Sequence, residues 1–81
     1  MHQALDAFLK DLESNKKKGK QIYVELLVQS NIISGNLVDI SNDFETITVS
    51  DIHRNDKYLN TTLTILSANI LGWNAKISDK E

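Results

Sequence analysis

The sequence contains no cysteine and no proline, and only three glycines among its 81 residues. The absence of cysteine excludes disulfide bonds and the cysteine-based zinc sites that stabilise many small domains. A chain of this length buries only about 60% of its unfolded surface, so its core alone gives marginal stability. We therefore expect a single domain over residues 1–81 that gains further stability by assembling into an oligomer.

Long apolar runs are also missing. No segment reaches the length of a signal peptide or a membrane-spanning helix, which predicts a cytoplasmic protein that does not enter a membrane. The formal net charge is −2, so the chain as a whole has no basic field to attract nucleic acid. Lysine is nevertheless concentrated, because four of the nine basic residues lie within five positions, at Lys16, Lys17, Lys18 and Lys20.

The first part of the chain has the pattern of an amphipathic helix, predicted over residues 2–15. Leu5, Phe8, Leu9 and Leu12 recur at the spacing that places side chains on one helical face. The lysines that follow suit the negative end of the helix dipole, and the next glycine suits a helix stop.

The remainder of the chain alternates apolar and polar residues with a period of two, which is typical of strands. Strands are predicted over residues 21–30, 32–40, 44–50, 58–66 and 70–73, followed by a frayed polar tail over 74–81. Gly35 interrupts the second strand, and a glycine inside a strand marks a bend or a close backbone approach. A short sheet needs such a bend to curl into a barrel. The sequence thus predicts a mainly β fold with one N-terminal α-helix, in which residues 21–73 form a small, five-stranded, bent antiparallel barrel.

This order of elements resembles the Sm-like (Lsm) family, including its Hfq-like bacterial branch. The first family motif has a glycine in a bent second strand and then a polar turn, here Gly35 and residues 41–43, followed by Phe44. The second motif joins the last two strands, and residues 65–73 are similar to it in apolar spacing. The resemblance implies an Sm-like, SH3-like barrel that assembles into a homo-oligomeric ring of six or seven copies and binds RNA, as an RNA chaperone does.

The sequence also departs from the family's RNA-binding positions. Glu45 stands where the family has a base-binding asparagine, and Leu66 and Ser67 stand where it has an arginine-glycine pair. A carboxylate repels phosphate, and leucine offers no hydrogen bond. These changes favour an alternative function, an oligomeric protein-interaction scaffold that has lost uridine-type RNA recognition. A third possibility is an unrelated SH3-like barrel that acts as a monomeric adaptor.

Two groups of residues are candidates for RNA contact. Lysines can attract phosphate, and polar or aromatic loop residues can contact bases. The candidates are Lys16, Lys17, Lys18, Lys20, Asn42, Phe44, Ser67 and Asn69. Each group also has a structural interpretation: the lysines could be a solvated helix end, Phe44 could be a core residue, and Asn42 could simply form a turn.

The sequence contains no pattern that points to catalysis. Neither histidine has a partner at metal-ligand spacing, and the sequence has no glycine-rich phosphate loop or nucleophile elbow. We therefore expect a protein that is not an enzyme and that has no catalytic residue, no metal site and no cofactor.

Overall fold

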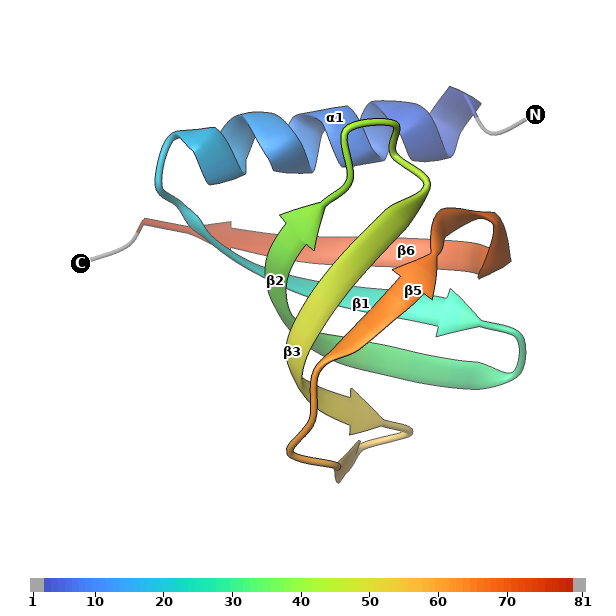
Figure 1. Ribbon diagram of the computed structural model, residues 1–81. Coiled ribbons are helices and arrows are strands. Elements are labelled where there is room, and N and C mark those ends of the chain that lie inside the picture. Colours follow the sequence, from blue (N-terminus) through green and yellow to red (C-terminus); the bar gives the residue numbers. More distant parts are fainter. Residues whose placement is uncertain (1–2, 80–81) are drawn as a thin grey trace.

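The computed structural model of the protein describes residues 3–79, which form one helix and a curled antiparallel sheet (Figure 1). The helix α1 (Gln3–Lys17) comes first, and three long strands follow: β1 (Gln21–Val28), β2 (Asn31–Ile40) and β3 (Thr46–Arg54). The later elements are β4 (Lys57–Tyr58), β5 (Leu63–Leu66), the 3-10 turn η1 (Ser67–Asn69) and β6 (Ile70–Ser78). The predicted mainly β fold with one N-terminal α-helix is confirmed.

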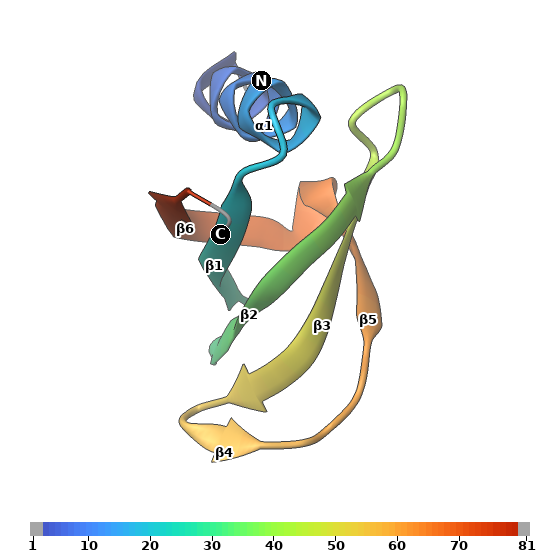
Figure 2. The ribbon, with the colours of Figure 1, turned by 90° about the vertical axis from the view of Figure 1, so that its left-hand side faces the viewer.

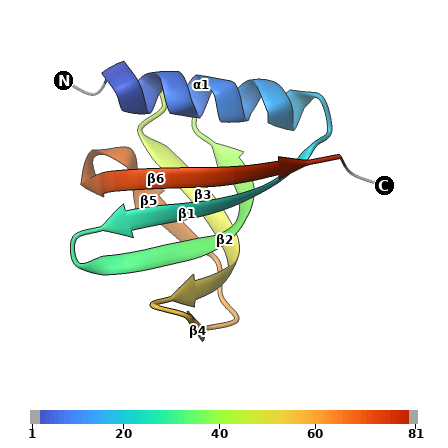
Figure 3. The same cartoon turned by 180° about the vertical axis from the view of Figure 1, so that it is seen from behind.

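The apolar face predicted for the helix is confirmed. Three leucines of α1 are buried, and Phe8 packs against the same core and stacks on Trp73 of β6, with 5.7 Å between the ring centroids. α1 ends at Lys17 rather than at 15, and the chain turns where Gly19 adopts a φ of 78°. The predicted start at residue 2 lies outside the described residues. α1 therefore lies across one end of the curled sheet and covers its interior (Figure 3).

The sheet has the strand order β4-β3-β2-β1-β6, and β5 pairs with β3 beside this path. Every pairing is antiparallel. The strands predicted over 21–30, 32–40 and 44–50 correspond to β1, β2 and β3, with their ends shifted by a few residues. Thirteen hydrophobic side chains from α1 and the strands form one buried cluster, and none of the buried side chains in residues 4–79 is polar or charged.

Gly35 stands at the point where β2 bends over β3. The register between these strands shifts between Ser34 and Asn36 and again between Leu37 and Asp39. A Cβ at Gly35 would collide with the backbone oxygen of Ser50, so the close backbone approach predicted for this glycine is confirmed. Beyond the bend, β2 and β3 sweep away from β1 (Figure 2).

The single strand predicted over 58–66 is wrong, because the structure divides it into β4 and β5. The chain between them does not extend as a strand. Its Leu59 N–H donates to the Ile52 carbonyl and its Thr61 carbonyl accepts from the Ile52 N–H, while Asn60 adopts a φ of 49°. These bonds hold the intervening loop against β3, so the strand resumes only at Leu63.

Of the predicted small antiparallel barrel, the structure shows the curled antiparallel sheet, which is not closed. Over the part of the chain that the structure describes, β5 pairs with β3 and β6 pairs with β1, but no pairing joins β5 to β6. The reason is η1, which turns the chain so that β6 runs back along β1 instead of returning along β5 (Figure 1). The sheet is curled but open.

The polar tail predicted from residue 74 is wrong as well, because β6 continues to Ser78. Ala75 and Ile77 stand opposite Val24 and Ile22 of β1, whose side chains are buried. Ala75 and Ile77 therefore lie on the side of β6 that faces the interior. The polar residues beside them make the strand alternation difficult to recognise in the sequence. Residues 80 and 81 lie outside the described part of the chain.

Candidate nucleic-acid interface

The four lysines predicted to contact phosphate lie where α1 ends and β1 begins. We call Lys16, Lys17, Lys18 and Lys20 the lysine cluster. The first three are exposed, whereas Lys20 is partly covered and its Nζ lies 2.8 Å from Asp79 Oδ1. This hydrogen bond, and next the positive charge of Lys20, lower the pKa of the Asp79 carboxyl below its ordinary value. Three of the four ammonium groups are thus free of an ion pair with any residue that the structure describes.

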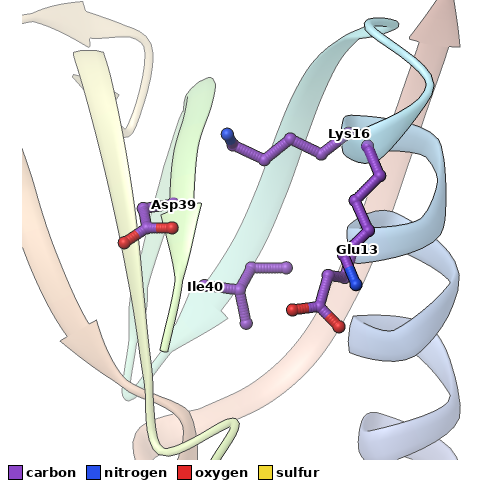
Figure 4. A pocket seen from close by; sticks show the side chains of 5 residues that line it. Glu13, Lys16, Asp39 and Ile40 are labelled. Carbon is purple, nitrogen blue, oxygen red and sulfur yellow. The ribbon is translucent and has the colours of Figure 1, made fainter. Parts of the chain in front are cut away.

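Two shallow hollows open beside the lysine cluster. The smaller has a volume of about 160 Å³ and lies between the end of α1 and the end of β2 (Figure 4). Lys16 and Lys17 line it together with Glu13, Asp39 and Ile40, so its charge is mixed. The larger has a volume of about 350 Å³ and lies between the start of β1 and the middle of β2. Lys16 borders both hollows.

The second group of predicted residues begins in the turn between β2 and β3. Ser41 organises this turn: its Oγ accepts hydrogen bonds from the N–H groups of Glu45 and Thr46, both at 3.0 Å, and donates to Asp43 Oδ1 at 2.8 Å. The bond from Ser41 is the main cause that lowers the pKa of Asp43. Asn42 projects from the turn and is exposed.

Phe44 has a different environment from Asn42. It is partly buried, it packs against the hydrophobic cluster, and its backbone adopts a φ of 60°. The interpretation of Phe44 as a core residue is therefore supported.

Ser67 brings η1 against this turn. Its Oγ donates to the Phe44 carbonyl at 2.7 Å, and its N–H donates to the Glu45 carbonyl at 2.8 Å. Asn42 and Phe44 therefore belong to one surface with Ser67 and the exposed Asn69, although the two segments are more than twenty residues apart in the sequence. We call Asn42, Phe44, Ser67 and Asn69 the turn surface.

The structure does not bring the lysine cluster and the turn surface together. In Figures 1 and 3, the C-terminal end of α1 and η1 lie at opposite ends of the helix axis. One copy of the chain therefore presents two separate patches rather than one continuous site. The turn surface also carries the exposed side chains of Glu45 and Leu66, neither of which can donate a hydrogen bond to a nucleotide.

Two strand edges flank the turn surface. Within residues 3–79, β5 pairs on one side alone, with β3, and β6 pairs on one side alone, with β1. Large apolar side chains on these strands are exposed by about 37% to 66% in a single chain: Leu63, Leu66, Leu71, Trp73 and Ile77. An unpaired strand edge beside apolar side chains is a template for pairing with another chain.

A polar network around Tyr58 was not predicted. The Tyr58 hydroxyl lies 2.9 Å from Asn60 Oδ1 and 3.3 Å from Asp51 Oδ1, and its ring packs against His53. Desolvation, and next the Asp51 charge, raise the pKa of Tyr58. The sequence spacing of these residues matches no motif, so only the folded chain reveals the network.

Other kinds of site have no support in the structure. Among residues 3–79, no three His, Cys, Asp or Glu side chains come together as a metal site would require. Within the same range, α1 is too short and too polar to cross a membrane.

Comparison with known proteins does not assign the chain to a family: no family model, no curated protein and no solved structure matches it.

Proposed function

We propose that the protein is a cytoplasmic RNA-binding protein that acts as a homo-oligomeric ring, in the manner of an Sm-like RNA chaperone. The observation that carries the proposal is the pair of open edges on β5 and β6, which η1 holds at neighbouring positions on the molecule. Both edges are lined by apolar side chains that a single chain leaves exposed.

The two edges favour a closed assembly. Pairing of β5 in one copy with β6 in the next uses two different surfaces of each chain, so it is a head-to-tail contact. Contacts of this kind form a ring when the rotation between neighbours closes, and a ring of six or seven copies leaves neither β5 nor β6 with an open edge. The same pairing would cover Leu63 and Trp73 and supply the stability that a domain of this size lacks.

A ring would also strengthen the attraction of the lysine cluster for phosphate, compared with a single chain. Each copy contributes exposed ammonium groups at the end of α1, and the ring repeats them around one assembly. Many weak phosphate contacts on one particle raise the overall affinity through their high effective concentration. The turn surface would add base contacts through Asn42 and Asn69.

The alternative is an oligomeric scaffold that binds protein instead of RNA. Glu45 and Leu66 favour it, since they place a carboxylate and an apolar side chain on the turn surface. The net charge of −2 favours it too. The scaffold would form the same ring, so the two functions differ in RNA affinity and not in assembly.

Two measurements on the full chain test the proposal. Size-exclusion chromatography with light scattering should give the mass of six or seven copies, and a monomer would contradict the ring. Binding of short uridine-rich and adenine-rich RNA should be measured across a salt series, since phosphate contacts weaken as salt rises. The absence of binding at low salt would leave the scaffold as the function.

A matched pair of variants assigns the RNA contact. The double variant Lys17→Glu/Lys18→Glu should lower RNA affinity by about tenfold or more, because it reverses two exposed charges in every copy. The control Lys10→Glu/Lys57→Glu makes the same change in net charge at exposed positions outside the lysine cluster. Equal losses of RNA affinity in the two variants would show that the affinity depends on the total charge of the protein and not on the lysine cluster.

A further inference from the structure

The larger hollow beside the lysine cluster is formed by two strands that separate. The β1–β2 ladder ends at the pair Tyr23 and Asn36. Before Tyr23, the residues of β1 stay paired with β6, and after Asn36 the residues of β2 stay paired with β3. The two strands therefore diverge from this pair toward α1, as Figure 2 shows, and the hollow of about 350 Å³ lies between them.

This divergence leaves one edge of β2 without a partner over Leu37–Ile40. None of these four residues pairs with β1, and no backbone hydrogen bond joins them to a turn or loop in the described part of the chain. Four residues of extended chain span about 13 Å. Val38 is 43% exposed, and the register between β2 and β3 skips it. Val38 is therefore the one residue of these four that pairs with neither neighbouring strand.

The walls of the hollow combine apolar groups with positive charge. Ile22, Leu37 and Val38 supply the apolar part, and Lys16 and Lys20 stand at the end nearest α1. Lys20 already binds the carboxylate of Asp79, which follows the last strand of this chain. The acidic residues Glu13 and Asp39 line the neighbouring hollow. Asp39 belongs to the free edge of β2, but it is not among the residues that line this hollow.

We propose that this hollow is a docking groove for an extended acidic peptide of a partner protein, which adds as a short strand along Leu37–Ile40 of β2. Main-chain hydrogen bonds to the free strand edge give affinity in strand addition, and pockets for alternate side chains give selectivity. Apolar side chains of the peptide would lie against Leu37 and Val38, and its carboxylates would approach Lys16. RNA fits this groove less well, because no aromatic side chain lines it to stack on a base.

The groove shares Lys16 and Lys20 with the lysine cluster, but it shares no residue with the edges proposed for assembly. It lies on β1 and β2, whereas the edges proposed for assembly lie on β5 and β6. Failure of the ring or of the groove therefore leaves the other standing.

The test uses the full chain and a labelled eight-residue peptide of alternating valine and glutamate. Fluorescence anisotropy measures its affinity, and NMR amide shifts locate the site. We expect shifts concentrated at residues 19–22 and 36–40. A peptide of alternating valine and lysine should bind at least about tenfold more weakly, and N-methylation of the central residues of the acidic peptide should abolish binding, because it removes the main-chain donors.

Variants of the protein test the same geometry. Lys16→Glu should weaken peptide binding by about fivefold or more, whereas Lys57→Glu, the same change far from the groove on β4, should leave it unchanged. Val38→Pro should abolish strand addition, and Val38→Ala is its control. If Val38→Pro does not fold, the N-methylated peptide decides the same point on the unaltered chain.

Three results would overturn the proposal. The first is equal affinity for the acidic and basic peptides, and the second is unchanged binding after N-methylation. The third is a set of amide shifts confined to β5 and β6, which would show that peptides add to the assembly edges instead. Uridine-rich RNA that shifts residues 36–40 while the acidic peptide does not would assign the groove to nucleic acid.

Discussion

The backbone at Gly35 lies directly against the carbonyl oxygen of Ser50, so that no side chain fits between β2 and β3 at their crossing. A Cβ at this position would also come within 2.7 Å of Val49 Cγ1, a side chain buried in the core. The bend of β2, the curl of the sheet and the divergence of β2 from β1 all begin at this contact.

We expect Gly35→Ala to lower the free energy of unfolding by about 1–3 kcal/mol, because the added methyl group must displace backbone. Urea unfolding followed by circular dichroism measures the change. Gly72→Ala is the matched control, since its Cβ would lie 3.5 Å from the nearest atom, in ordinary contact with Leu27. Equal stability of the two variants would contradict the role given to the Gly35 crossing.

Trp73→Ala should destabilise the chain, because Trp73 stacks on Phe8 and holds α1 against β6. Trp73 is 37% exposed, so we expect a loss of about 2 kcal/mol rather than the roughly 3–5 kcal/mol of a fully buried tryptophan. Trp73→Phe should restore most of the loss, since it keeps a stacked ring. If Trp73 also lies at a subunit contact, Trp73→Ala should dissociate the ring at concentrations where the monomer stays folded, which light scattering detects.

Ser41→Ala should loosen the turn between β2 and β3. Its Oγ accepts two backbone N–H groups, and their loss should cost about 1–2 kcal/mol of unfolding free energy. Asn42→Ala in the same turn should leave stability nearly unchanged, because Asn42 is exposed. RNA binding separates the roles further: a fall in affinity for Asn42→Ala without a fall in stability would assign Asn42 a contact with RNA.

The Lys20–Asp79 pair predicts a specific dependence on pH. The pKa of Asp79 is lower in the folded chain than in the unfolded chain, where it is about 3.9. The pair therefore stabilises the fold at pH values above the unfolded pKa. This stabilisation is lost as the pH falls through the lower pKa of the folded chain. Carboxyl-detected NMR should show the pKa of Asp79 below that of an ordinary aspartate. Lys20→Gln should return Asp79 to its ordinary range while leaving Asp43 low, because Asp43 depends on Ser41 instead.

The strands nearest to Gly35 could be predicted from the sequence because their alternation is regular. In β1, Ile22, Val24 and Leu26 are buried and the residues between them are exposed, which is the pattern that the sequence shows. The helix was predictable for the same reason. In β6, by contrast, Ala75 and Ile77 alternate with Asn74 and Lys76, and this weaker pattern reads as a polar tail until the pairing with β1 is known.

Whether the sheet closes, and which residues of the candidate site come together, depends on contacts between residues that are distant in the sequence. Nothing near Ser67 in the sequence indicates that its hydroxyl binds the Phe44 carbonyl, or that η1 directs β6 away from β5. The exposure of Lys16, Lys17 and Lys18 could be predicted from their charge. The groove beside them could not, because it forms where β1 and β2 diverge. Local patterns report which face of an element is apolar, and they do not report which elements meet.

The direction of β6 decides how the molecule should be attached to a sensor. Lys20 and Asp79 hold the end of β6 beside the end of α1, while α1 begins at Gln3 on the far side (Figure 3). A tether fused after β6 would crowd the lysines and the docking groove. Charged residues in the tether would also compete with the ligand for the lysines. Attachment ahead of α1 leaves the lysines and the docking groove facing the solution, so experiments that measure peptide binding on a surface should use that end.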